Sequence, residues 1–280
     1  MIFAVAYFAV RALHIAVYTY GAQDVDIRGA IVNLAPGLLG APALLIAAAL
    51  FDGPAQIAIW IIVLVFDYGT PYVRDVSGFR VSPSHFAERF NLIVIIALGE
   101  SIVAIGAGIE GGELTPGVVL AALTGMALAG AQWWAYFDVV ALVAERKLRE
   151  AQGIARNRLA RDSWGVMHGL LIAGIILTAL GVKTIGAVDE PLKLVPAAAL
   201  CGGIALYLLG HVAIRLRSVR TLNRQRLLAA ILALGLIPLA LEVDALAALA
   251  MVTALMVGLV AYEALRFRER RAELRAVAHP

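Results

Sequence analysis

Long apolar runs, separated by short polar segments, make up most of this chain. A membrane-spanning helix needs about 20 predominantly apolar residues, and each run is close to that length. The runs predict nine spanning helices, near residues 2–20, 29–50, 54–72, 89–109, 116–138, 163–185, 192–213, 227–243 and 245–265. Only Glu242, Val243 and Asp244 separate the last two, so this region can instead form one re-entrant hairpin. The pattern therefore predicts an all-α, polytopic transmembrane helix bundle, with a single transmembrane domain over 1–280.

The composition also favours a membrane location. Of the 280 residues, 62% are hydrophobic and 15% are charged, whereas a typical soluble domain is about 45–50% apolar. The segments between the runs are too short to form a soluble catalytic domain. The single cysteine, Cys201, lies within a predicted span, which excludes a disulfide within the chain and a cysteine-based metal site.

Lys and Arg residues lie predominantly on one side of this arrangement. If the segment after the fifth span is cytoplasmic, 20 of the 23 Lys and Arg residues lie on that side. Only Lys183 and Lys193 lie on the other side, and Arg11 lies within the first span. Cytoplasmic loops carry an excess of Lys and Arg. The asymmetry therefore predicts a cytoplasmic C-terminus and three basic cytoplasmic segments, 139–162, 214–226 and 266–280.

The basic segments have two interpretations, which are compatible. The positive-inside bias alone accounts for the formal net charge of +3 and needs no nucleic acid as a partner. Alternatively, the segments bind anionic lipid headgroups, since each base near the membrane surface contributes about 1 kcal/mol. The candidate lipid contacts are Arg146, Lys147, Arg149, Arg156, Arg158, Arg215, Arg217 and Arg220.

The segment IIALGESIVAIG (95–106) places an acid in the middle of the fourth apolar run. Glu100 lies at the midpoint of that predicted span, where a charged group costs about 2.5–3.5 kcal/mol or more. Such residues usually face the interior of the bundle and are by default candidates for function. Arg11 is the only basic residue predicted at the same depth, so it is the candidate partner.

Other polar residues fall in the cytoplasmic halves of the predicted spans. They are His14, Asp67, Glu88, Asp138, His168 and His211. One interpretation is a hydrated vestibule that opens to the cytoplasm and ends at Glu100. The other is that these side chains reach the membrane interface, where a polar group costs little free energy.

Proline and glycine predict helix breaks in two spans. Pro36, Gly37, Gly40 and Pro42 lie in the second span, and Pro238 follows Gly235 in the eighth. Broken helices line the substrate sites of many transporters, although proline kinks also serve packing alone. The second span is thus the candidate gate.

The segment SHFAERFNLIVIIALGESIVAIG (84–106), with its E-R pair and its L-G-E-S core, resembles the signature of the bacterial low temperature requirement protein A family. WWAYFD (133–138) and the YLLG segment with the arginines after it (207–217) are also similar to that family. The resemblance implies a multi-pass protein of the bacterial inner membrane. Its motif positions here are Glu88, Arg89, Gly99, Glu100 and Ser101.

Members of that family carry an earlier segment of the type E-L-F-F-D-L, which has no counterpart here. The resemblance therefore predicts that this chain lacks N-terminal spans of the family. The family name refers to growth in the cold, and no settled biochemical activity accompanies it.

Three functions remain open. The preferred one is an ion- or proton-coupled transporter or channel, in which Glu100, with Ser101 beside it, binds a proton or cation and His168 and His211 relay protons. The second is a structural or lipid-sensing protein linked to cold growth. The third is a metal-dependent enzyme that modifies lipids.

The residues decide only part of this choice. The metal-dependent enzyme would use His14, His85, His168, His211 and Asp67 or Asp138 as ligands, yet no two histidines have metal-site spacing. A non-enzymatic function is favoured, with no cofactor and no metal. The partners are the lipid bilayer, anionic lipids and an ion or solute that the sequence does not identify, and the oligomeric state stays open.

Overall fold

The computed structural model describes residues 1–21, 24–74, 76, 78–109, 114–183, 188–269 and 271–273. Over these residues it is helical, without a strand of its own. Eight helices in this part of the chain are long and apolar enough to cross a membrane. The prediction of an all-α, polytopic helix bundle is therefore confirmed.

The chain divides into two compact units. Unit 1 comprises Met1–Val81 and Gln152–Arg161, and unit 2 comprises Ser82–Ala151 and Asp162–Pro280. The prediction of a single transmembrane domain stays a prediction.

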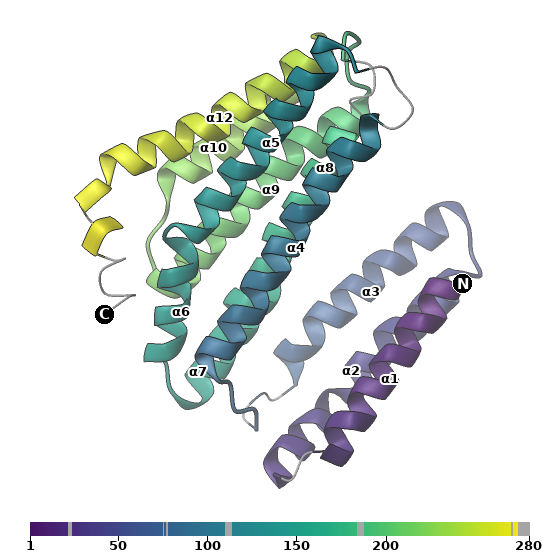
Figure 1. Cartoon of the computed structure of the whole chain (residues 1–280). Coiled ribbons are helices and arrows are strands. Elements are labelled where there is room, and N and C mark those ends of the chain that lie inside the picture. Colours follow the sequence, from purple (N-terminus) through teal and green to yellow (C-terminus); the bar gives the residue numbers. More distant parts are fainter. Residues whose placement is uncertain are drawn as a thin grey trace. The chain divides into compact units, whose positions relative to one another are not determined.

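Unit 1 is built from three long helices, α1 (Ile2–Gly21), α2 (Val25–Ala48) and α3 (Gly53–Val73), with the short α7 (Gly153–Leu159). Helix α2 packs against both α1 and α3 (Figure 1). The hydrophobic core of unit 1 contains Ala4, Ala41, Leu45 and Val63. The amide of Asn157 on α7 donates to the backbone carbonyls of Val76 and Phe79, both at 2.8 Å. These bonds tie α7 to the segment after α3.

The predicted break in the second span is wrong, because α2 is one continuous helix that includes Pro36 and Pro42. The glycines between these prolines instead allow close packing. A Cβ on Gly37 would lie 2.1 Å from Thr70 Cγ2, and a Cβ on Gly40 would lie 2.6 Å from the Phe66 ring. Small residues let membrane helices approach closely, so this segment is a packing surface for α3 and not a gate.

Unit 2 contains the remaining helices. They are α4 (Pro83–Ile109), α5 (Pro116–Phe137), α6 (Val140–Glu150), α8 (His168–Lys183), α9 (Leu194–Val219), α10 (Arg224–Gly235), α11 (Ile237–Ala240) and α12 (Ala245–Arg266). A π-helix, η1 (Ala160–Met167), leads into α8. Helix α9 is central and contacts α6, α8, α10 and α12 (Figure 1).

Helices α8 and α9 pack with their backbones in contact. A Cβ on Gly174 would lie 2.4 Å from the backbone nitrogen of Tyr207, and one on Gly203 would lie 2.5 Å from that of Thr178. Further along α8, a Cβ on Gly181 would lie 2.6 Å from the backbone nitrogen of Leu200. Side chains larger than hydrogen do not fit at these positions, so α8 and α9 leave no space between them here.

The predicted eighth span crosses unit 2 in two pieces. Helix α10 ends at Gly235 and α11 begins at Ile237, as Pro238 predicted. Helix α10 has 12 residues, about 18 Å at 1.5 Å per residue, which is shorter than the roughly 30 Å core of a bilayer. The segment still reaches the far end, because Asp244 pairs with Pro191 in the loop before α9. The region is thus a broken crossing followed by α12.

Candidate functional site

A pocket of about 620 Å³ opens at one end of unit 2, which we call the basic end. Helices α5, α9 and α12 end there, and α10 begins there. Its volume lies within the range of about 300–1,000 Å³ that is typical of small-molecule sites. The walls come from the α5–α6 connection, the last turns of α9, the start of α10 and the end of α12.

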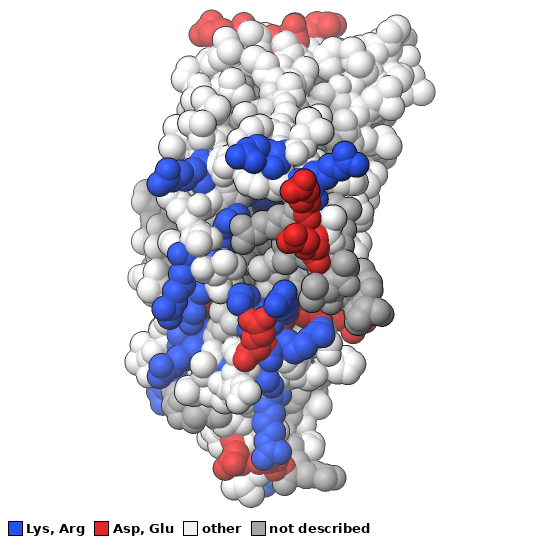
Figure 2. All heavy atoms as spheres, turned by 90° about the vertical axis from the view of Figure 1, so that its left-hand side faces the viewer, with Lys and Arg blue, Asp and Glu red and all other residues white. Residues whose placement is uncertain are grey.

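The described lining of the pocket is positively charged. It contains the basic residues Arg146, Lys147, Arg215, Arg224, Arg226 and Arg271 and the acidic residues Asp138 and Glu263. Glu150, outside the lining, pairs with Arg146 at 2.8 Å and with Lys147 at 2.7 Å. On the face seen in Figure 2, an uncharged band separates gathered Lys and Arg side chains from Asp and Glu side chains at the upper rim. The pocket therefore favours an anionic ligand.

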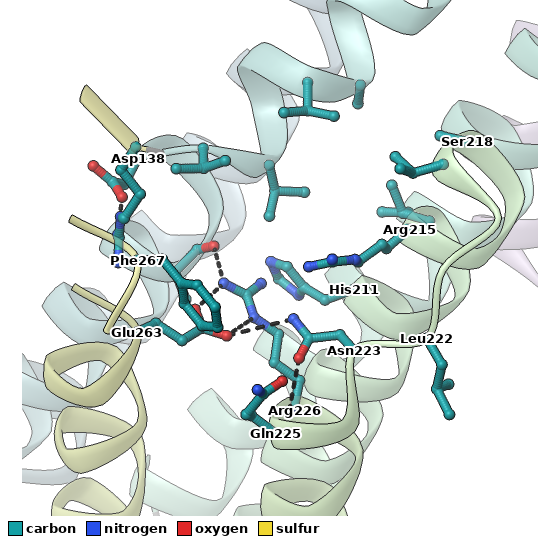
Figure 3. A pocket seen from close by; sticks show the side chains of 18 of the residues that line it. Asp138, His211, Arg215, Ser218, Leu222, Asn223, Gln225, Arg226, Glu263 and Phe267 are labelled. Atoms are coloured by element: carbon teal, nitrogen blue, oxygen red, sulfur yellow. Dashed lines mark hydrogen bonds and ion pairs between the residues drawn. The ribbon is translucent and has the colours of Figure 1, made fainter. Parts of the chain in front are cut away.

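A buried ion pair between Arg226 and Glu263 forms the floor of the pocket (Figure 3). Arg226 Nε donates to Glu263 Oε1 at 2.9 Å, and Nη2 donates to Oε2 at 2.7 Å. Nη2 also donates to the carbonyl of Ala135 at 3.1 Å. Such two-point contact fixes both position and orientation. The remaining nitrogen, Nη1, is buried and has no hydrogen-bond partner among the described residues.

The start of α10 explains why Arg226 is held there. Asn223 is the N-cap of α10, and its Oδ1 accepts from the backbone N–H of Arg226 at 3.2 Å. The Asn223 amide donates to Glu263 Oε1 at 3.4 Å. One residue thus both caps the helix and braces the acid opposite it. The floor of the pocket is preorganised by secondary structure.

His211 of α9 is the second buried polar group of the pocket. Its Nδ1 lies 2.9 Å from the carbonyl of Tyr207. Because a carbonyl only accepts, Nδ1 carries a proton. The ring packs edge-on against the Tyr207 ring at 4.4 Å. Nε2, on the other side of the ring, has no partner within the part of the chain that the structure describes.

His168 lies in a neighbouring cluster, whose Tyr136 ring packs edge-on against His211 at 6.1 Å. Tyr136 Oη lies 2.9 Å from His168 Nε2 and 2.8 Å from Asn91 Oδ1. The other ring nitrogen, Nδ1, lies 2.7 Å from the carbonyl of Ser163, five residues earlier in the π-helix. The ring also stacks on Trp164 at 4.5 Å. Both nitrogens have partners, so His168 holds α4, α5 and α8 together.

The acid of the sequence motif lies outside the pocket. Buried positions on α4 form one stripe, Val94, Ala97, Leu98, Ser101, Ala104 and Ile105. Glu100 is about 100° away from Ser101 around the helix and is exposed on unit 2. The sequence predicted a buried carboxylate at mid-membrane, and the exposure of Glu100 on unit 2 does not confirm this prediction. The Ser101 hydroxyl is buried without a partner among the described residues.

Two further motif residues, Glu88 and Arg89, lie at the exposed start of α4. Glu88 pairs with His85 at 3.7 Å, and Arg89 is exposed. Neither residue lines the pocket.

Arg11 finds its partner within unit 1. Its Nη2 lies 3.5 Å from Asp67 Oδ2 and donates to Tyr7 Oη at 2.7 Å, and its Nε donates to the same hydroxyl at 3.0 Å. His14 is exposed on the same helix and packs against Tyr18. The residues predicted to form one vestibule are thus divided. Asp138 and His211 line the pocket, whereas Arg11, His14 and Asp67 belong to unit 1.

The predicted lipid contacts are divided as well. Arg146, Lys147 and Arg215 line the pocket. Arg149 pairs with Glu145, and Arg217 pairs with the buried Asp162 at 2.8 Å. Arg156 and Arg158 lie on α7 of unit 1, and Arg220 is exposed at the end of α9.

The sequence interpretation missed the floor of the pocket. Arg226 was counted only as one of many bases, and Glu263 was not singled out. Glu263 is nevertheless an acid inside the last apolar run, which is the same signal that selected Glu100. The metal-enzyme alternative gains no site, because the described residues hold no group of three His, Cys, Asp or Glu side chains that could bind a metal.

Comparison with known proteins adds the family. The sequence profile described as bacterial low temperature requirement A protein matches residues 1–261. The uncharacterized protein RA0937 of Rhizobium meliloti (strain 1021) is 27% identical over 197 residues, which cover 65% of this chain and 46% of that protein. The match thus spans less than half the length of that relative. No solved structure matches the chain.

Proposed function

Since the chain belongs to the bacterial low temperature requirement A family, as the segment 84–106 predicted, we propose that this membrane-embedded helical protein is a transporter of an anionic solute. The observation that carries the proposal is the pocket at the basic end, with Arg226 and His211 at its floor. The basic end faces the cytoplasm of a bacterial cell in this proposal, as the distribution of Lys and Arg predicts.

The pocket opens at one end of unit 2, and access from a single side supports a role in transport. Beyond Tyr207, α8 and α9 touch along Gly174, Gly181 and Gly203, so these two helices leave no passage between them toward the opposite end. Alternating access needs a site that is open to one side while the other is sealed. The break between α10 and α11 lies beside α9 and α12, and in this proposal it is the hinge that moves α10, whose first residues line the pocket.

This proposal moves the binding site away from Glu100. Coupling to an ion or proton stays part of it, because the His211 Nε2 atom is a buried proton acceptor that faces the same chamber as the solute. Glu100 and His168 then have no direct contact with the solute.

The test is a current measurement on proteoliposomes adsorbed to a solid-supported membrane. Concentration jumps of sodium phosphate, bicarbonate and acetate are compared with chloride, in liposomes with and without protein. We expect a protein-dependent current for at least one of these anions. The double variant Arg226→Met with Glu263→Leu, which removes both floor charges together, is expected to abolish it. Absence of current for every anion would overturn the proposal.

A second function, recognition of anionic lipid without transport, is favoured by one observation. Three predicted lipid contacts, Arg146, Lys147 and Arg215, line the pocket. Polybasic surfaces attract anionic headgroups. If anionic lipid raises the unfolding temperature of the wild-type protein and this gain is lost in Arg215→Gln, while no anion carries current, lipid recognition becomes the better account.

A further inference from the structure

Two polar atoms at the pocket floor have no hydrogen-bond partner among the described residues, and together they restrict the ligand to a narrower class than anions in general. We propose that the floor binds a phosphate group that retains an O–H, either inorganic phosphate or a phosphomonoester headgroup. This inference rests on the proposed function, since it names the class of ligand that the same pocket takes.

The first of these atoms is a donor. Nε and Nη2 of Arg226 donate hydrogen bonds to Glu263 and Ala135. The N–H groups of Nη1 have no partner among the described residues. The arginine is 5% exposed. An unpaired buried donor is costly, and a charged oxygen of a ligand satisfies it best.

The second atom is an acceptor. The Tyr207 carbonyl fixes the proton of His211 on Nδ1, so Nε2 of the neutral ring offers a lone pair to the pocket. His211 is 2% exposed. Figure 3 shows the labelled side chains of His211, Arg215 and Arg226 directed into the same space from α9 and α10. A ligand that satisfies both atoms must accept from Arg226 and donate to His211.

Few anions do both. Sulfate, carboxylates and phosphodiesters carry no O–H near neutral pH. Inorganic phosphate carries two in its monoanion and one in its dianion, the two forms present near neutral pH, and a phosphomonoester carries one in its monoanion. Bicarbonate also carries an O–H, but it is planar and singly charged. The tetrahedral, more highly charged phosphate is better matched to a pocket in which Arg215 and Arg226 enter from different helices.

Titration calorimetry of the purified full chain in detergent tests this inference. Sodium phosphate, sulfate and bicarbonate are titrated at neutral pH and equal ionic strength. One hydrogen bond to a charged ligand corresponds to about tenfold in affinity, so we expect phosphate to bind at least about tenfold more tightly than sulfate. Equal affinity for phosphate and sulfate would overturn the inference, and tighter binding of bicarbonate would do the same.

Two variants identify the atoms responsible. His211→Phe keeps a ring against Tyr207 but removes the acceptor, so the preference for phosphate over sulfate should disappear. Arg215 is exposed, and Arg215→Gln should weaken both anions by about fivefold, as loss of one charged contact near the surface does. Arg149→Gln is the matched control, because Arg149 is an exposed α6 arginine outside the pocket. Phosphate binding unchanged in both pocket variants would contradict the assignment.

A lipid arm separates the two sources of phosphate. Nanodiscs with phosphatidic acid, a phosphomonoester, are compared with nanodiscs containing phosphatidylglycerol, a phosphodiester. Protection against heat by phosphatidic acid alone, without binding of free phosphate, identifies a lipid as the source. Phosphate binding without any current keeps this inference and removes transport. Anion current without preference for phosphate over sulfate keeps transport and removes this inference.

Discussion

Among the acid–arginine pairs that the described residues form between helices, one in each unit can be compared, and the two differ in how completely they engage the arginine. In unit 1, Arg11 and Asp67 meet through a single contact of 3.5 Å, with side chains 27% and 26% exposed. In unit 2, Arg226 and Glu263 meet through two bonds, with side chains 6% and 11% exposed.

The surroundings of the two arginines also differ. Tyr7 takes the two remaining bonds described for Arg11. Arg226 instead keeps a buried nitrogen without a described partner at the floor of a pocket. A pair that is satisfied by its own protein stabilises the fold, whereas a rigid pair with an unused donor is prepared to bind a ligand. This contrast is the reason for placing the function in unit 2.

The largest effect is expected from Glu263→Gln. The change leaves Arg226 buried without its countercharge, which typically costs about 3–5 kcal/mol. Thermal unfolding of the purified protein should show a large fall in the midpoint. The double variant Arg226→Met with Glu263→Leu should recover most of the loss, because apolar replacement of a buried pair is often neutral. Equal destabilisation of the single and double variants would mean that packing, not charge, holds this floor.

Tyr136→Phe probes the polar cluster beside the pocket. Loss of the hydroxyl leaves the buried His168 Nε2 and the half-buried Asn91 Oδ1 without their described partner, at a cost of about 1–3 kcal/mol. We expect a lower unfolding midpoint and unchanged phosphate affinity by calorimetry. A loss of phosphate binding in a stable variant would extend the site from the pocket to His168.

Asp67→Asn is the counterpart of Glu263→Gln in unit 1. The amide oxygen of Asn can still accept from Arg11, and Tyr7 keeps its bonds, so the expected loss is at most about 1 kcal/mol. The unfolding midpoint of this variant is compared with that of Glu263→Gln under the same conditions. If the two acids proved equally important, the contrast between the pairs would fail.

Glu100→Gln is expected to have the smallest effect. Glu100 is exposed on unit 2 and does not line the pocket, so phosphate affinity and anion current should match those of the wild-type protein. A variant that binds phosphate normally but carries no current would return Glu100 to the transport mechanism as the coupling group.

The sequence predicted the helices well because apolar length is a local property. It also located the break near Pro238. It failed at Pro36 and Pro42, because whether a helix breaks depends on what packs beside it, and Gly37 and Gly40 face Thr70 and Phe66 across the α2–α3 contact. That contact cannot be derived from residue spacing.

The candidate site was predicted in part. Asp138, His211, Arg146, Lys147 and Arg215 were selected, and all line the pocket. The pairing of Arg226 with Glu263 joins residues 37 positions apart on two helices, so no helical periodicity reveals it.

The exposure of Glu100 on unit 2 was not predicted, because depth in the membrane is readable from the sequence, whereas the direction of a side chain is set by neighbouring helices. The buried stripe around Ser101 becomes evident only once α4 is packed on α8 and α5.

Uptake of radiolabelled phosphate into proteoliposomes is the most direct test of the central claim that the unit 2 pocket is an anion transport site. The wild-type protein should accumulate phosphate above protein-free liposomes, and excess unlabelled phosphate should compete where sulfate does not. The Arg226→Met with Glu263→Leu variant, reconstituted to the same density, should show only the protein-free level. Uptake by this variant at the wild-type rate, or no uptake by either protein, would contradict the claim.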